Sequence, residues 1–268
     1  MLDTLWRLPR AIRTQDLVLG TFIYLRDPAA TAAAAQAGMD FVVIDLEHTA
    51  LSLVDVEQHV AAAQFGGAAP LIRVTDPDPK LIARVLDLGA EGILVPQVHT
   101  VADAEAAAAA CRYPPRGNRG MCRVTRATNY TESAFDDYAT RAQAGVTCMV
   151  LIESLQGCEN ATAIAGVDGV DVVMPGRGDL SASAGVLGAL ESDRVNALAE
   201  QVIVDTARSA EAAAGMVIFR PEELDRWQSA GARVVIFSQD SRLLANVYAE
   251  RVAEVRAKVP AAKAAGVR

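Results

Sequence analysis

Short runs of apolar residues alternate with longer, alanine-rich stretches along the whole chain. Eight runs stand out: Leu17–Tyr24, Phe41–Asp45, Pro70–Val74, Gly92–Val95, Val146–Ile152, Val170–Met174, Gly215–Phe219 and Arg233–Phe237. They are rich in Val, Ile, Leu and Phe and carry few charges, which is typical of strands buried on both faces of a parallel sheet. The pattern therefore predicts eight parallel strands.

The stretches between these runs have the composition of helices. Five are marked by their ends: Pro28–Ala37, Leu53–Gln64, Pro79–Leu88, Val101–Cys111 and Pro221–Ala230. Proline near the start and glycine just past the end is the usual asymmetry of helices. Two longer intervals, 112–144 and 180–214, are each expected to hold a loop and a helix. The tail, 258–268, is expected to fray.

Strands that alternate with helices over this length predict an α/β fold, a (β/α)8 TIM barrel. No linker divides the chain, so we expect a single domain over residues 1–268. A doubly wound open sheet is the alternative. Its dinucleotide-binding version loses support because no G-x-G-x-x-G follows the first predicted strand.

Composition and charge reduce the number of possible functional classes. Hydrophobic residues make up 51% of the chain and charged residues 22%, which excludes a mainly disordered protein. The net charge of −8 argues against nucleic-acid binding, which needs a basic face. No apolar run reaches the roughly 18 residues of a membrane span, and the N-terminus lacks the apolar core of a signal peptide. We therefore expect a cytoplasmic protein with no membrane partner.

Polar residues follow several predicted strands, at the strand ends where barrels carry their active sites. The second run ends in Asp45-Leu-Glu47-His48, the third contains Arg73, the fifth ends before Glu153, and the sixth ends before Gly176-Arg177-Gly178-Asp179. A single charge at a strand end is weak evidence. Several charged residues that meet in one barrel mouth favour a functional site there.

Glu153 and Asp179 follow neighbouring predicted strands. Two facing carboxylates suit a hard divalent cation such as Mg²⁺ or Mn²⁺. In the alternative, Glu153 pairs with an arginine and Asp179 caps a helix that starts near Leu180. The glycines on either side of Arg177 precede that helix start, where backbone N–H groups can meet an anion.

Arg73 lies on a buried strand and needs an anionic partner. A substrate carboxylate or enolate oxygen would serve, and so would a structural ion pair with Asp45, Asp87 or Glu47.

His48 lies three residues after Asp45, so an Asp–His pair could set its tautomer for proton transfer; a structural histidine is the alternative. His59 falls within a predicted helix and is taken as a bystander. His99 could reach the mouth. The four cysteines form no C-x-x-C pair, which leaves zinc and redox motifs unsupported.

Six blocks of sequence follow one another along the chain. They are Asp45-Leu-Glu-His48, Leu71-Ile-Arg73-Val, Leu86-Asp87-Leu-Gly-Ala-Glu-Gly-Ile-Leu-Val-Pro96, Arg112-Tyr-Pro-Pro-Arg-Gly-Asn-Arg-Gly120, Ile152-Glu153-Ser and Gly178-Asp179-Leu-Ser-Ala-Ser-Ala-Gly185. In order and spacing, from about Gly20 to Asp240, the chain resembles the HpcH/HpaI aldolase family. The resemblance implies a phosphoenolpyruvate/pyruvate-type barrel that forms hexamers (trimers of dimers), often with the last helix exchanged between protomers.

The resemblance also implies a metal-dependent class II aldolase, a carbon–carbon lyase that acts on a 4-hydroxy-2-oxo acid through a pyruvate enolate. Glu153 and Asp179 would bind the metal (Mg²⁺, Mn²⁺ or Co²⁺). Arg73 would stabilise the enolate oxygen, and His48, paired with Asp45, would transfer protons. Backbone N–H groups of Gly178 and Asp179 would hold the substrate carboxylate. Alternatives are a decarboxylase or thioester lyase with the same enolate chemistry, and a non-catalytic metal-binding barrel.

Three residues and one segment depart from the pattern implied by the resemblance. Leu151 stands where the family usually has Gln, Arg177 replaces the Pro of a Gly-Pro, Ser238 replaces a Gly, and Met216–Phe219 replaces a Gly-containing segment. Leu151 removes a polar group near metal-bound water. Arg177 adds a cation that either recognises a second acid group or points outward. The aldehyde partner is expected to be set by the Arg112–Tyr130 loop and by residues of a neighbouring protomer.

Overall fold

The eight strands close into a parallel barrel in chain order. The structure, a computed structural model, describes residues 6–131 and 135–258. The strands are β1 (Val18–Ile23), β2 (Phe41–Asp45), β3 (Ala69–Arg73), β4 (Gly92–Val95), β5 (Thr147–Ile152), β6 (Val172–Pro175), β7 (Ala213–Ile218) and β8 (Val234–Gln239). β8 pairs with β1, in register at Val18 and Val234. The predicted barrel is confirmed. The alternative, an open doubly wound sheet, is wrong because the first and last strands, β1 and β8, pair with each other and close the sheet.

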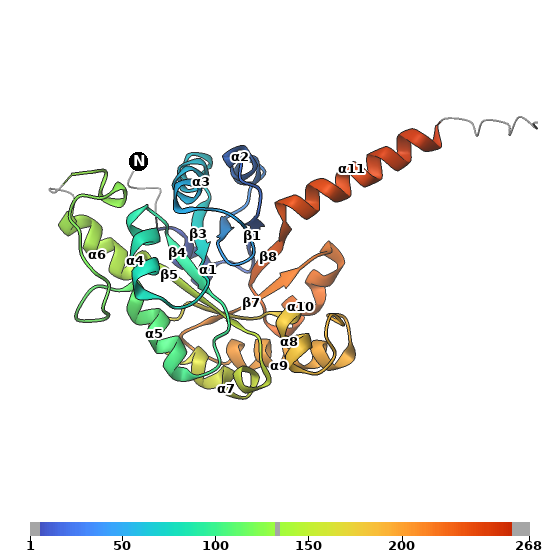
Figure 1. Ribbon diagram of the computed structural model, residues 1–268. Coiled ribbons are helices and arrows are strands. Elements are labelled where there is room, and N and C mark those ends of the chain that lie inside the picture. The colour runs from blue at the N-terminus through green and yellow to red at the C-terminus, as the bar shows by residue number, and fades with distance from the viewer. Residues whose placement is uncertain (1–5, 132–134, 259–268) are drawn as a thin grey trace, which may run out of the picture.

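Helices follow the strands and surround the barrel (Figure 1). They are α1 (Leu8–Thr14), α2 (Pro28–Gln36), α3 (Leu53–Gly66), α4 (Pro79–Asp87), α5 (Val101–Cys111), α6 (Phe135–Gly145), α7 (Leu155–Ala165), α8 (Arg177–Ser183), α9 (Asp193–Ala207), α10 (Leu224–Ala230) and α11 (Asp240–Ala257), with short 3-10 turns η2 (Arg126–Thr128) and η4 (Pro221–Glu223). The expected helices are present. The sequence did not predict α1 and α7, because α1 is only two turns long and α7 carries Gly157 in its first turn.

One end of the barrel is closed by apolar side chains. Leu8 and Ile12 of α1 pack with Phe41 in the cluster that fills the barrel interior. Phe41 fits because Gly20 faces it: a Cβ at Gly20 would lie 2.6 Å from the ring atom Cδ2. The plug covers the N-terminal ends of the strands. Among the described residues, the cavity between the strand ends lies at the opposite end of the barrel.

The long segment after α5 lies at this closed end. α5 runs antiparallel to the strands, so its last residues lie beside the strand N-termini. Arg119 is buried there between the rings of Tyr113 and Tyr138, at 4.7 and 5.6 Å from their centroids, and donates to Asp87 at 2.7 Å. No residue of the Arg112–Tyr130 loop lines the cavity at the opposite end of its own barrel. The expectation that this loop and residues of a neighbouring protomer set the aldehyde partner stays a prediction.

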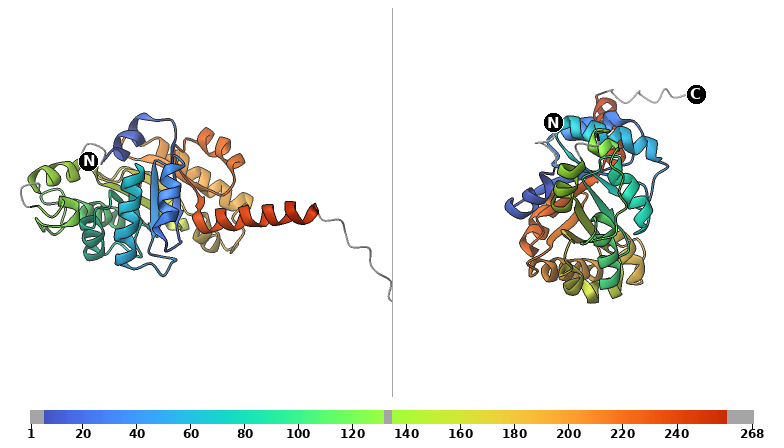
Figure 2. Two further views of the ribbon diagram at one scale, coloured as in Figure 1. Left: turned by 90° about the horizontal axis from the view of Figure 1, so that it is seen from above. Right: turned by 90° about the vertical axis from the view of Figure 1, so that its left-hand side faces the viewer.

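The last helix leaves the barrel. α11 projects away from the other helices (Figures 1 and 2), and none of its residues is buried. Exposed apolar side chains run along it: Leu244, Val247, Tyr248, Val252 and Val255. No helix within the described ranges is both long and apolar enough for a membrane span. The expected fraying of the tail concerns residues that, from 259 on, lie outside the described part of the chain.

A buried carboxyl group at the closed end makes stability depend on pH. Glu91 is 3% exposed and accepts the backbone N–H of Trp6 at 2.9 Å. Burial raises the pKa of Glu91 from 4.5 to about 7. The folded protein therefore binds more protons than the unfolded chain between these pH values, and stability falls as pH rises through this window.

Glu91→Gln removes the charge and keeps the shape. We expect its free energy of unfolding to exceed that of the wild type by up to about 3 kcal/mol at pH 8, with the difference shrinking towards pH 5. Urea unfolding at both pH values measures this. Glu105→Gln, at an exposed position on α5, is the control and should show no such trend. An equal effect of Glu91→Gln at both pH values would contradict the assignment.

Candidate active site

A cavity of about 210 Å³ opens at the C-terminal ends of the strands. It brings together most of the residues that the sequence singled out, along with an apolar wall. Its lining is Phe22, Tyr24, His48, Arg73, Leu151, Glu153, Gly176, Arg177, Gly178, Asp179, Leu190, Val217, Phe219 and Gln239. Six strands and their following loops thus contribute charge or hydrogen-bonding groups to one space.

Arg73, the last residue of β3, is held on several sides. Its Nε donates to Asp45 Oδ1 at 3.0 Å, and its Nη2 donates to Asp45 Oδ2 as well. Nη1 lies 3.4 Å from Glu47 Oε2, and the guanidinium stacks 4.6 Å from the centroid of the Phe22 ring. Burial opposes ionisation of Asp45, but the hydrogen bonds from Arg73 keep its pKa below the usual value. The predicted structural ion pair exists, with Asp45 and Glu47 rather than Asp87.

His48 does not pair with Asp45 through its ring. The backbone N–H of His48 points to Asp45 Oδ1 at 3.3 Å, while the imidazole Nε2 lies 3.5 Å from Glu47 Oε2. The predicted side-chain pair is wrong, because Asp45 is fully buried beside Arg73 and the imidazole is half exposed. His48 still lines the cavity, with Glu47 as its carboxylate neighbour.

Glu153 follows β5 and is 8% exposed. Its Oε2 accepts the backbone N–H of Gln97 at 2.8 Å. Burial raises the pKa of Glu153 to about 7, and the negative charges of Asp179 and Glu47 add to the rise against the opposing hydrogen bond. Glu153 is therefore not neutralised by an arginine, as the structural alternative proposed. It faces further negative charge.

Asp179 lies in the first turn of α8, which starts at Arg177 with Gly176 at the cap position. The predicted start near Leu180 and the capping role of Asp179 are wrong, because the helix begins three residues earlier. Asp179 is exposed and lines the cavity. The N–H groups of Gly178 and Asp179 stand at the N-terminus of α8, where backbone donors have no partner within the helix.

Arg177 is already neutralised by protein groups. Its guanidinium donates to Glu223 at 2.6 Å, lies 3.4 Å from Glu191, and donates to the carbonyl of Val217 at 3.3 Å. It is 4% exposed and stacks on Trp227. It neither points outward nor offers a free charge, so the prediction that it binds substrate has no support in this geometry. Its contacts fasten the loops after β6 and β7 together.

The carboxylates fit a divalent metal. No three His, Cys, Asp or Glu side chains form a ready cage within residues 6–131 and 135–258. Mg²⁺ needs only one or two carboxylates, because it keeps several waters and takes substrate oxygens. Glu153 and Asp179 supply hard oxygen donors. Burial, the main cause of the raised pKa of Glu153, makes its anionic form unfavourable unless a cation lies beside it.

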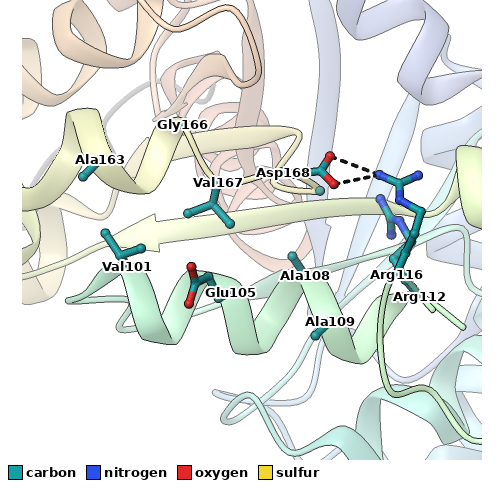
Figure 3. A pocket seen from close by; sticks show the side chains of 11 residues that line it. Val101, Glu105, Ala108, Ala109, Arg112, Arg116, Ala163, Gly166, Val167 and Asp168 are labelled. Atoms are coloured by element: carbon teal, nitrogen blue, oxygen red, sulfur yellow. Dashed lines mark hydrogen bonds and ion pairs between the residues drawn. The ribbon is translucent and has the colours of Figure 1, made fainter. Parts of the chain in front are cut away.

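Two other histidines and a second cavity lie outside this site. His59 is buried and pairs with Thr31 at 2.7 Å, in keeping with a structural role. His99 pairs with Ser154 at 2.7 Å and does not line the cavity. A wider hollow of about 400 Å³ lies between α5 and α7 (Figure 3). Its walls are mostly Ala, Gly and Val with an Arg116–Asp168 pair, and it lies outside the barrel.

Sequence reasoning missed three residues of the site. Tyr24 and Phe22 flank Arg73, and Gln97 holds Glu153. Tyr24 could have been noticed as the polar end of the first apolar run. Gln97 acts through its backbone N–H in a left-handed conformation (φ 53°), which leaves no signal in the side-chain pattern.

Comparisons with known proteins agree with this architecture. The model of the HpcH/HpaI aldolase/citrate lyase family matches residues 19–247. The hydroxypyruvate/pyruvate aldolase of Pseudomonas aeruginosa is 33% identical over 259 residues, 96% of each chain. The crystal structure of an HpcH/HpaI aldolase/citrate lyase family protein from Burkholderia cenocepacia J2315 superposes with a TM-score of 0.87 and 30% identity, and covers 93% of this chain and 98% of that chain.

A more distant structure shares the fold alone. The citrate lyase beta subunit of M. tuberculosis, solved with oxaloacetate and magnesium, has a TM-score of 0.55 and 18% identity over 86% of this chain and 95% of that one. Barrel and relatives together define an enzyme of the aldolase type, a carbon–carbon lyase. The chain belongs to the HpcH/HpaI aldolase/citrate lyase family.

The space for Glu153 depends on Gly176. A Cβ at Gly176 would lie 2.6 Å from Glu153 Cγ, whereas a Cβ at Gly178 would meet nothing within 4 Å. We expect Gly176→Ala to lower the free energy of unfolding by about 1–3 kcal/mol through overpacking. Gly178→Ala, the matched control, should be neutral or slightly stabilising. Urea unfolding checks both, and equal stability of the two variants would refute the steric role.

Proposed function

We propose that the protein is a divalent-metal-dependent aldolase that cleaves or forms a 4-hydroxy-2-oxo acid through a pyruvate enolate. The observation that carries this is the buried, uncompensated carboxylate of Glu153, which shares one cavity with Asp179 and the fixed cation of Arg73. Such a site holds a cation and an anionic substrate side by side. The family membership and the aldolase relative support the reaction class.

Glu153 and Asp179 would hold the metal. Once bound, a divalent metal supplies Lewis acidity that polarises a 2-oxo acid. The citrate lyase subunit that shares this fold was solved with magnesium. Gln97 fixes one oxygen of Glu153 with its backbone N–H and leaves the other free for a ligand.

The remaining groups bind and orient the pyruvate unit. The N–H groups of Gly178 and Asp179 donate to its carboxylate at the positive end of α8. Arg73 donates to the 2-oxo oxygen, where negative charge develops as the enolate forms. Its attachment to Asp45 and Phe22 sets the guanidinium in place before the substrate arrives, so little reorganisation is needed.

His48 serves proton transfer. Its half-exposed imidazole lines the cavity and can take the proton of the 4-hydroxyl group during cleavage. The neighbouring Glu47 carboxylate would stabilise the imidazolium that results, in the role first assigned to Asp45.

The proposed assembly is a hexamer in which α11 packs against a neighbouring protomer. The apolar stripe of α11 has no partner within the described part of its own chain. The hexamer and the cytoplasmic location stay predictions.

Removal of either metal carboxylate is the central test. We expect Glu153→Gln and Asp179→Asn to lose pyruvate release by at least 100-fold while remaining folded. The assay uses a panel of 4-hydroxy-2-oxo acids and oxaloacetate with Mg²⁺, Mn²⁺ or Co²⁺, and EDTA should abolish the wild-type activity. Release from oxaloacetate alone would instead indicate a decarboxylase. Full activity of both variants, or activity that EDTA leaves intact, would reject the metal mechanism.

The apolar stripe of α11 gives a test of the assembly. We expect the double variant Tyr248→Asp/Val252→Asp to sediment as a smaller species than the wild type, because charges would enter the proposed contact. Glu250 lies on the other side of the helix, some 200° around its axis from Tyr248. Glu250→Gln, the control, should therefore leave the sedimentation coefficient unchanged. An unchanged coefficient for the double variant would contradict the proposal that α11 packs against a neighbouring protomer.

A further inference from the structure

Tyr24 brings a hydroxyl group into the cavity beside Arg73. It is the first residue after β1, and its Oη accepts a hydrogen bond from Arg73 Nη2 at 2.9 Å. Its backbone N–H donates to Asp240 Oδ1 at 2.9 Å, and its ring meets Phe22 edge-on with centroids 6.2 Å apart. Backbone and ring are thus both fixed, so the hydroxyl group has a defined position.

The hydroxyl group of Tyr24 lines the cavity and accepts one hydrogen bond, from Arg73. Asp45 receives three hydrogen bonds at Oδ1, from the backbone N–H groups of Glu47 and His48 and from Nε of Arg73, and one at Oδ2, from Nη2 of Arg73. Asp45 is near enough to the Tyr24 hydroxyl group to favour its protonated form. Burial raises the pKa of Tyr24 to about 12, so the phenol is a neutral donor at neutral pH.

Tyr24 stands across the barrel mouth from the metal carboxylates. In a closed barrel of eight strands in chain order, β1 and β5 are diametrically opposed. Glu153 follows β5 and Asp179 follows β6, whereas Tyr24 follows β1. Arg73, which the proposed function places on the 2-oxo oxygen, follows β3 between these two sides and lies 2.9 Å from the Tyr24 hydroxyl group. A substrate that reaches past Arg73 from the side of β5 and β6 meets Tyr24.

We propose that Tyr24 is a catalytic residue for the aldehyde half of the substrate, with its O–H group donating to the 4-oxygen. This rests on the proposed function. In cleavage the C3–C4 bond breaks, its electron pair passes to the pyruvate enolate, and C4–O becomes the aldehyde carbonyl as His48 takes the hydroxyl proton. Tyr24 keeps its own proton and stabilises the charge on the 4-oxygen.

Two assays on Tyr24→Phe test the aldehyde half and the pyruvate half of the reaction separately. Pyruvate release from a 4-hydroxy-2-oxo acid needs the 4-oxygen, whereas exchange of the pyruvate methyl protons with D2O needs only the enolate machinery. We expect kcat/KM for pyruvate release to fall about 10- to 100-fold. Methyl exchange, followed by NMR, should stay within about twofold of the wild type. Thr14→Val removes an exposed hydroxyl group from α1 at the closed end of the barrel, and this control should change neither rate.

Each other result overturns the inference. Equal losses in both assays would mean that Tyr24 only positions Arg73, because the exchange also uses Arg73. Unchanged pyruvate release would mean that the hydroxyl does not touch the reacting oxygen. A wild-type enzyme with neither exchange nor release would overturn the proposed function itself, and this inference with it. Urea unfolding of Tyr24→Phe confirms that the variant is folded.

Discussion

The buried contact between Arg73 and Asp45 sets the charge balance on which the site depends. Asp45 is fully buried, and Arg73 has little exposure of its own. Breaking such a pair leaves an uncompensated buried charge, at a cost of about 3–5 kcal/mol. Arg73 is paired with Asp45 and Glu47, and within residues 6–131 and 135–258 Glu153 forms no ion pair. The way Arg73 is held thus leaves Glu153 free for the cation that we propose.

The barrel fold places these charged residues at the C-terminal ends of the strands. α1 and Phe41 fill the N-terminal end, so the open end is the one where the loops after the strands converge. Strands supply short, rigid attachment points, which keeps side chains from β1, β3 and β5 in fixed relation. The loop that contains Arg119 serves the closed end, where it fastens α4 and α6 by stacking and an ion pair.

Arg177 lies near the site but has a structural role. Its partners, Glu223 and Glu191, come from two other loops, and Glu223 also accepts the N–H groups of Phe219 and Arg220. This network fixes the wall on which Val217 and Phe219 lie. The Arg242 guanidinium lies over the Phe219 ring, 4.6 Å from its centroid.

The sequence by itself determined the barrel, because eight charge-poor runs separated by helix-like stretches fit few other arrangements. It also marked Arg73, Glu153 and Asp179, since charges at the ends of buried strands must be accounted for. Only the tertiary structure decided their partners. Asp45 faces Arg73 instead of His48, and Arg177 turns to Glu223, which is 46 residues further along the chain. Partner choice depends on which loops meet in space, and spacing along the chain does not encode that.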